Sequence, residues 1–203
     1  MTMKNTLLAA ALLCTTTAHA SNMDTGKLSE SKVTAGYSSL SVDSSSTMEP
    51  TFNGLSVSIG QQLQNNFYGQ LGYQELNDDI DVSGVTVDTE FKRVDLRFGK
   101  QLDIDNASLW YLEAGYMFSK VEASAMGSSG ESTDNEFVAA IGYKRALTDA
   151  FVVDAGVEYF DSSAALTTSV QFSVSNALAL SASFSASEDY TQLGLNVVYF
   201  IGM

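Results

Sequence analysis

The sequence predicts an all-β fold, a transmembrane antiparallel up-and-down β-barrel of about ten strands, with about eight as the alternative. Apolar and polar residues alternate with period two through most of residues 32–203, and helical spacing is nowhere sustained. Short connections alternate with longer ones along the chain, as in bacterial transmembrane barrels. Aromatic residues gather at both ends of the apolar face, as expected for girdles at the lipid headgroups.

The first residues predict a secretory signal peptide over residues 1–20. Lys4 is followed by an apolar run from Leu7 to Cys14 and then by Ala18-His19-Ala20, which gives a basic start, a short apolar core and a small-residue cleavage site. The run is too short for a membrane-spanning helix, which needs about 20 apolar residues. We expect residues 21–31 to form a short N-terminal segment and residues 32–203 to form the barrel.

Each predicted strand is a run of alternating residues bounded by turn-forming or polar residues. The predicted strands are Lys32–Val42, Phe52–Leu63, Phe67–Leu76, Thr89–Lys100, Leu109–Ala123, Glu136–Arg145, Phe151–Phe160, Leu166–Ser175, Ala177–Ser187 and Tyr190–Ile201. The longer connections are predicted to be outer loops rich in Ser, Gly and acidic residues: Asp43–Thr51, Asn77–Asp88, Ser124–Asn135 and Asp161–Ala165.

The alternation also predicts which side chains face outward. The residues expected to face lipid include Leu180, Leu195 and Val197, whereas Ser181, Gly194 and Asn196 are expected to face the lumen. A soluble secreted barrel that binds an apolar ligand, as lipocalins do, has the same period and remains an alternative. The alternating loop lengths and the two aromatic girdles favour lipid over a soluble core.

Charge and composition exclude several functions. The chain carries 10 basic and 24 acidic residues, a net charge of −14, which argues against nucleic acid as a partner. His19 and Cys14 are the sole histidine and cysteine, and both lie in the predicted signal peptide. Without them a zinc site, a disulfide framework and a histidine base are missing, so we expect neither an enzyme nor a cofactor.

Charged residues on the inward-facing register form the first candidate site, a lumen charge network. Two arginines lie on one predicted strand, with carboxylates beside them and on later strands, and such charges survive away from bulk water only when paired. The network comprises Arg93, Asp95, Arg97, Glu113, Asp154 and Glu158. It predicts either a salt-bridged plug across the lumen or a wet, weakly conducting pore of mixed charge.

Two lysines in the outward register form the second candidate site. Lys92 and Lys120 lie at the outer ends of neighbouring strands, close to Glu90 and Glu122, and would form a basic spot on an acidic rim. Such a spot could contact lipopolysaccharide phosphates. The alternative is a pair of weak cross-strand ion pairs, Lys92 with Glu122 or Lys120 with Glu90.

The acidic run Asp78-Asp79-Ile80-Asp81 falls in the predicted loop Asn77–Asp88. Three carboxylates this close could hold calcium, but the spacing does not match an EF-hand loop. We interpret the run as a solvated, self-repelling loop.

The C-terminal strand carries a further signature. Every second residue back from Met203 is apolar, namely Met203, Ile201, Tyr199, Val197, Leu195 and Leu193. This resembles the signal read by the outer-membrane assembly machinery. Together with the signal peptide and strand pattern, Lys32 to Met203 resembles the small outer-membrane barrels of the OmpA and OmpX/Ail type.

The resemblance implies a barrel in the cell outer membrane, surrounded by lipid and lipopolysaccharide and inserted by the assembly machinery through its last strand. We expect a monomer. The expected function is a non-enzymatic structural or surface-contact role with acidic outer loops. The alternatives are a narrow passive porin-like channel for ions or small solutes, and the soluble lipocalin-like barrel.

Overall fold

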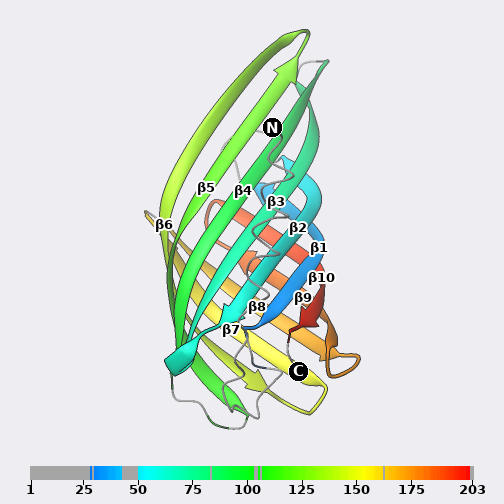
Figure 1. Ribbon diagram of the computed structural model, residues 1–203. Helices are drawn as coiled ribbons and strands as arrows, with labels where there is room; N and C mark the ends of the chain where they lie inside the picture. The colour runs from blue at the N-terminus through cyan, green and yellow to red at the C-terminus, as the bar shows by residue number, and fades with distance from the viewer. Residues whose placement is uncertain are drawn as a thin grey trace.

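The computed structural model describes residues 28, 30–42, 50–82, 84–102, 105, 107–161 and 163–201, which wind into one closed barrel (Figure 1). The predicted signal peptide and the terminal Met203 lie outside these residues. In the described part of the chain, no helix is long and apolar enough to cross a membrane.

Ten antiparallel strands make up the barrel, each paired with its neighbours in the sequence, and β1 closes against β10. The elements are β1 (Lys32–Val42), β2 (Thr51–Gln62), the 3-10 turn η3 (Gln64–Asn66), β3 (Phe67–Val82), β4 (Val85–Leu102), β5 (Ser108–Ala125), β6 (Ser128–Ala146), β7 (Phe151–Phe160), β8 (Ser163–Ser173), β9 (Leu178–Ala186) and β10 (Tyr190–Phe200). The prediction of about ten strands is therefore confirmed, and the alternative of eight is wrong.

Two of the predicted outer loops are strands instead. The β3–β4 pairing continues to Val82 opposite Val85, and the β5–β6 pairing to Ala125 opposite Ser128. The predicted loops over Asn77–Asp88 and Ser124–Asn135 were therefore wrong. The turns are tight: Met126 and Gly127 both have positive φ, as a two-residue hairpin turn requires. Ser128–Asn135 contains no apolar residue, so alternation could not mark a strand there. Ile80 to Val87 do alternate, but the acidic residues and Gly84 among them favoured a loop.

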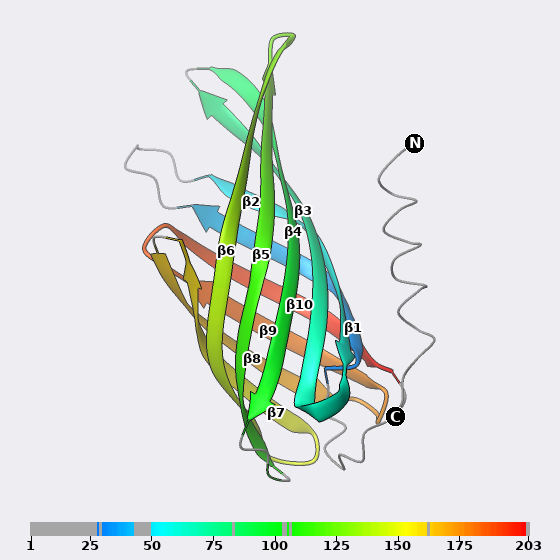
Figure 2. The same ribbon diagram turned by 60° about the vertical axis from the view of Figure 1, so that its left-hand side comes forward.

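These extensions form a projecting sheet, defined here as the parts of β3, β4, β5 and β6 that rise beyond the other strands (Figures 1 and 2). β2 pairs with β3 only as far as Asn77, and β7 pairs with β6 only from Val138. The barrel thus has a long-hairpin end, which carries the projecting sheet, and a short-turn end, which carries η3.

The outward face is an exposed apolar belt. Leu195 is 70% exposed, Leu180 50% and Val197 46%, whereas Gly194 is buried toward the lumen. This confirms the predicted register. At the short-turn end the outward rings pair, with centroids 5.4 Å apart for Phe67 and Phe98 and 4.9 Å for Trp110 and Tyr143. Large apolar side chains that are exposed in this way are typical of a lipid-facing surface.

Buried apolar side chains form clusters toward the two ends of the lumen. At the long-hairpin end, two clusters share Tyr190 as a neighbour and form the outer apolar layer: Leu40, Phe52 and Leu76, and Met117, Val138, Phe160 and Ala165. At the short-turn end, two further clusters form the inner apolar layer: Leu28, Leu109, Tyr111 and Val152, and Ala179, Val198 and Phe200. The charged residues lie between the two layers.

Candidate functional site: the charged lumen

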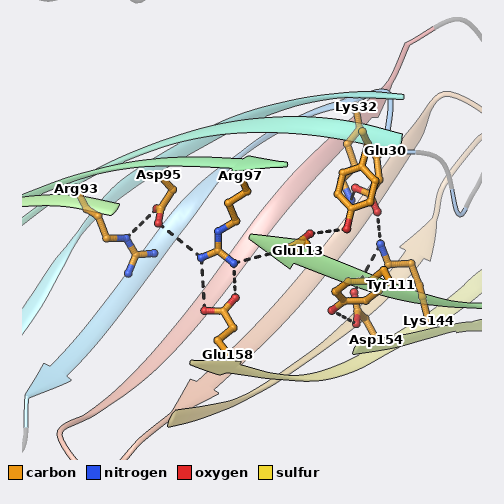
Figure 3. Close-up of polar contacts among 11 residues, drawn as sticks. Glu30, Lys32, Arg93, Asp95, Arg97, Tyr111, Glu113, Lys144, Asp154 and Glu158 are labelled. Atoms are coloured by element: carbon orange, nitrogen blue, oxygen red, sulfur yellow. Dashed lines mark hydrogen bonds and ion pairs between the residues drawn. The ribbon is translucent and has the colours of Figure 1, made fainter. Parts of the chain in front are cut away.

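Arg97 on β4 is the centre of the lumen network (Figure 3). Its Nη1 lies 2.5 Å from Oε1 of Glu158 on β7 and 3.4 Å from Oε2 of Glu113 on β5, and its Nη2 lies 3.6 Å from Oδ1 of Asp95. The Arg97 side chain is only 13% exposed. The planar guanidinium suits this role because it donates several hydrogen bonds in a fixed geometry. It joins the wall formed by β4 and β5 to β7.

The network extends from Arg97 in two directions. Toward the long-hairpin end, Arg93 Nε donates to Oδ2 of Asp95 at 3.0 Å. Toward the short-turn end, the Tyr68 hydroxyl on β3 donates to Oε1 of Glu113 at 2.7 Å. Each of these carboxylates therefore has at least one donor, as charges in a low-dielectric interior require.

A second cluster lies nearer the short-turn end and surrounds Lys144 on β6 (Figure 3). The Lys144 ammonium forms a very short ion pair with Glu30, lies 3.7 Å from Oδ2 of Asp154 and stands 5.3 Å from the centroid of the Tyr111 ring. The Tyr111 hydroxyl donates to Oδ1 of Asp154 at 2.9 Å, and Lys32 pairs with Glu30 at 2.8 Å. This cluster ties β1, β5, β6 and β7 to the segment that precedes β1.

Glycines create the space for the two lumen tyrosines. A Cβ atom at Gly99 would overlap the Tyr68 ring, and one at Gly142 would overlap the Tyr111 ring. Each glycine faces inward on the strand next to its tyrosine. The rings can therefore lie flat across the wall and direct their hydroxyls at Glu113 and Asp154.

The opposite wall, from β8 to β10, carries small hydroxyl side chains. Between this wall and the ionic clusters lies a polar chamber of about 300 Å³. Its charged lining is balanced, with Lys32, Arg93, Arg97 and Lys144 against Glu30, Glu113, Asp154 and Glu158. Its neutral lining includes Thr167, Ser169, Ser183, Ser185 and Gln192. Such a lining can hold water, since each polar group offers a hydrogen bond.

The six predicted network residues divide between the two clusters. Five meet around Arg97, whereas Asp154 lies in the cluster of Lys144 and Tyr111. Five residues of the two clusters were not among the site residues predicted from the sequence: Glu30, Lys32, Tyr68, Tyr111 and Lys144. Lys144 shares the inward register with Glu136 and could have been included on that ground. Glu30 precedes the first strand, and outside a strand alternation cannot predict whether a side chain points into the lumen.

The outward lysines make different contacts from those considered above. Lys92 pairs with Glu90 at 2.5 Å on its own strand. Lys120 pairs with Glu122 at 2.6 Å on its own strand and with Glu131 of β6 at 2.8 Å. The proposed cross-strand pairs Lys92–Glu122 and Lys120–Glu90 were wrong, because the register sets Lys92 opposite Lys120 and Glu90 opposite Glu122.

The acidic run lies on the extended end of β3 and not in a loop. Asp78 Oδ2 accepts a hydrogen bond from the Thr51 amide at 2.9 Å, and Asp81 Oδ1 accepts one from the Gly84 amide at 2.8 Å. Within the described ranges, no three His, Cys, Asp or Glu side chains converge as a metal site would require.

Comparison with known proteins identifies the family of barrels to which this lumen belongs. The sequence profile of the outer membrane protein beta-barrel domain matches residues 7–199. A search of curated proteins found no match.

Among solved structures, the beta domain of the Bordetella autotransporter BrkA is 13% identical, with a TM-score of 0.53, covering 83% of this chain and 98% of its own. Ail, the attachment invasion locus protein of Yersinia pestis, is 16% identical, with a TM-score of 0.46, covering 84% and 99%. OprG of Pseudomonas aeruginosa is 11% identical, with a TM-score of 0.48, covering 83% and 93%.

Proposed function

Because the chain belongs to the outer membrane protein beta-barrel domain family, we propose that it is a non-enzymatic barrel with a closed lumen. The protein is an outer-membrane protein, with its apolar belt in the lipid. Its role is structural or lies in surface contacts made by the projecting sheet. The observation that carries this proposal is the succession of apolar clusters and ion pairs along the lumen.

Three successive barriers support a closed lumen. The outer apolar layer packs around Tyr190, and apolar constrictions hinder ions by excluding water. Below it, the side chain of Arg97 bridges Glu113 and Glu158. The inner apolar layer follows, with Leu109 at 1% and Phe200 at 2% exposure. An ion would have to lose its hydration at both apolar layers, which is costly.

The projecting sheet supports the surface-contact role. Its carboxylates lie opposite one another across neighbouring strands: Asp79 opposite Asp88, Glu90 opposite Glu122 and Glu122 opposite Glu131. Lys92 and Lys120 pair with the three glutamates, whereas among the described ion pairs none includes Asp79 or Asp88. Like charges directly opposite repel one another, so the sheet favours contact with cations or basic surfaces. Divalent cations, which also bridge lipopolysaccharide phosphates, are the simplest such partners.

The polar chamber favours a second function, a narrow passive channel. It would conduct only if both apolar layers opened. The soluble lipocalin-like alternative is wrong, because the chain is an outer-membrane protein and its large apolar side chains are exposed around the whole barrel. The non-enzymatic part of the proposal rests on the chemistry of the chain, whose one histidine and one cysteine fall within the predicted signal peptide.

The predicted partners remain part of the proposal. We propose that lipid and lipopolysaccharide surround a monomer, and that the assembly machinery reads β10, the strand that closes the barrel on β1.

Liposome swelling tests the closed lumen. Vesicles that contain the purified protein should not swell faster than empty vesicles in isotonic arabinose, whereas vesicles with a general porin should. Swelling that increases with the amount of folded barrel would favour the channel instead. Heat-modified migration on gels would verify that the inserted protein is folded.

A further inference from the structure

The segment that precedes β1 lies inside the short-turn mouth of the barrel. Leu28 is 2% exposed and packs with Leu109, Tyr111 and Val152, which belong to β5 and β7. Ser31 lies on the other side, where its carbonyl accepts a hydrogen bond from the Ile201 amide and its hydroxyl accepts one from the Gln62 amide. Leu28 and Glu30, called the N-terminal plug below, therefore lie within the mouth, and Ser31 joins them to β1.

Glu30 anchors the middle of this plug. It is 4% exposed and its carboxylate is held between the ammonium groups of Lys144 and Lys32. Lys144 comes from β6, on the far side of the lumen from β1. The plug therefore reaches the residues that line the bottom of the polar chamber.

The barrel has a shaped seat for the plug. A Cβ atom at Gly60 would overlap the Glu30 carbonyl oxygen, so glycine provides the room at this point. Gln101 Nε2 donates to the Leu28 carbonyl at 3.3 Å, and the Glu30 amide donates to Gln62 Oε1 at 3.4 Å. Each of these hydrogen bonds between the barrel and the plug involves a side chain, whereas the strands of the barrel wall are joined by continuous backbone hydrogen bonds.

We propose that the N-terminal plug seals the polar chamber from the periplasm and can leave it without unfolding the barrel. The seal depends on one charged anchor, Glu30, and one apolar contact, Leu28. Removing one partner of a buried ion pair leaves the other unpaired, which strongly disfavours the seated state. The backbone ladder between β1 and β10 ends at the hydrogen bond from Ile201 to Ser31, so the barrel keeps this ladder when Leu28 and Glu30 depart.

A cysteine in the chamber reports whether the seal is closed. Ser183 lines the chamber on β9, and Cys14, the sole native cysteine, lies in the predicted signal peptide. The Ser183→Cys variant would be purified and folded in detergent. The rate at which its cysteine reacts with a charged, water-soluble thiol reagent would then be measured. In combination with Glu30→Ala or the isosteric Glu30→Gln, labelling should accelerate by at least about tenfold, because the plug loses its anchor.

Asp149→Asn is the matched control. It removes an exposed carboxylate from the turn between β6 and β7, outside the lumen network, so labelling should stay slow. Heat-modified migration would restrict the comparison to folded barrels. Rapid labelling of Ser183→Cys alone, or an unchanged rate with both Glu30 variants folded, would overturn the proposal.

The result is separable from the closed-lumen function. The outer apolar layer stays in place when the plug leaves, so Glu30→Ala should admit the thiol reagent but still conduct no current. Conduction in that variant would contradict the proposed closed lumen but would not contradict the proposal that the plug seals the chamber.

Discussion

At the scale of single residues, Arg97 is the side chain on which the lumen most depends. It contacts three carboxylates from three strands and is nearly buried. Arg97→Met would leave these carboxylates without their shared cation, and we expect a loss of about 3 kcal/mol of unfolding free energy. Arg93→Met is the matched control, since Arg93 bonds Asp95 alone in the contacts described and should cost less.

Urea unfolding in lipid vesicles measures both variants. Adding Glu158→Gln to Arg97→Met should recover part of the loss, because fewer unpaired charges remain. If Arg97→Met and the native protein have the same free energy of unfolding, the network is solvated and contributes little to stability.

Glu30 gives the plug a defined pH dependence. Burial alone would raise the pKa of its carboxyl, but the ammonium groups of Lys144 and Lys32 lower the pKa from 4.5 to about 2. A depressed folded-state pKa stabilises the seated plug fully above pH 4.5, and this stabilisation is lost as the pH falls from 4.5 toward 2. The other groups that face this cluster are the carboxylates of Asp154 and Glu113, which act on Lys144, and the hydroxyls of Tyr68 and Tyr111, which are neutral over this pH range.

The Ser183→Cys reporter would be labelled with a dipyridyl disulfide, which reacts with thiols in acid, and each rate divided by that of a free thiol at the same pH. This ratio should be low at pH 6 and rise below about pH 4. In the Glu30→Gln variant the ratio should be high and change little over this range. Acceleration of the same size in both proteins would assign the effect to other carboxylates.

These residues also show how far the sequence could predict the site. Arg93, Arg97 and Glu113 were found because alternation on a strand fixes the facing of every side chain. Which carboxylate each arginine contacts depends on barrel closure, since Arg97 and Glu158 lie on strands that are not adjacent. Glu30 was missed because it lies outside any alternating run.

At the scale of elements, neighbouring strands are fitted to each other by glycine and tyrosine pairs. A Cβ at Gly142 would displace the Tyr111 ring and with it the hydrogen bond to Asp154. We expect Gly142→Ala to destabilise the barrel by about 1–3 kcal/mol, the usual cost of overpacking. Gly130→Ala on the same strand is the control, because its added methyl meets nothing within 4 Å.

Both alanine variants can be compared by urea unfolding, and the fluorescence of Trp110, next to Tyr111 in the sequence, follows the transition. A Gly142→Ala barrel as stable as the Gly130→Ala barrel would mean that the wall accommodates the methyl group without moving the ring.

The lysines of β4 and β5 carry the proposed lipopolysaccharide contact. Lys92 and Lys120 lie directly opposite each other, and each also has a carboxylate on its own strand. Two adjacent ammonium groups attract a phosphate more strongly than either does alone. Lys92→Gln combined with Lys120→Gln should reduce the lipopolysaccharide that copurifies with the barrel.

Lys100→Gln is the control for this prediction, because Lys100 lies outward on β4 at the short-turn end, over the Phe67 ring. It should leave lipopolysaccharide retention unchanged. If the double variant retains as much as the native protein, the lysines serve only their ion pairs with Glu90, Glu122 and Glu131.

The projecting sheet marks the limit of prediction at this scale. Strand identity was clear where one face meets lipid and the other the lumen, as in β9 and β10. Beyond the lipid both faces of the hairpins meet water, and Ser128 to Asn135 carry no periodic signal. Asp78 to Val82 do alternate, but their three aspartates are typical of a solvated loop. Their pairing comes from the continuation of ladders begun in the membrane and from the tight turns at Gly84 and Gly127.

At the scale of the whole molecule, the barrel is a closed cylinder with an apolar outside, a charged middle and an apolar layer at each end. A barrel of eight strands is just filled by its own side chains, and ten strands leave slightly more room. That room is the chamber of about 300 Å³. Apolar clusters lie toward both mouths from the chamber. We propose that they close it, and this closure is the central claim.

Single-channel recording in a planar lipid bilayer tests this claim most directly. The native protein, shown to be folded and inserted by heat-modified migration after recovery from vesicles, should give no discrete current steps across the applied voltage range. A general porin in the same bilayer provides the positive control. Reproducible current steps whose frequency rises with the amount of folded native barrel would contradict the closed lumen.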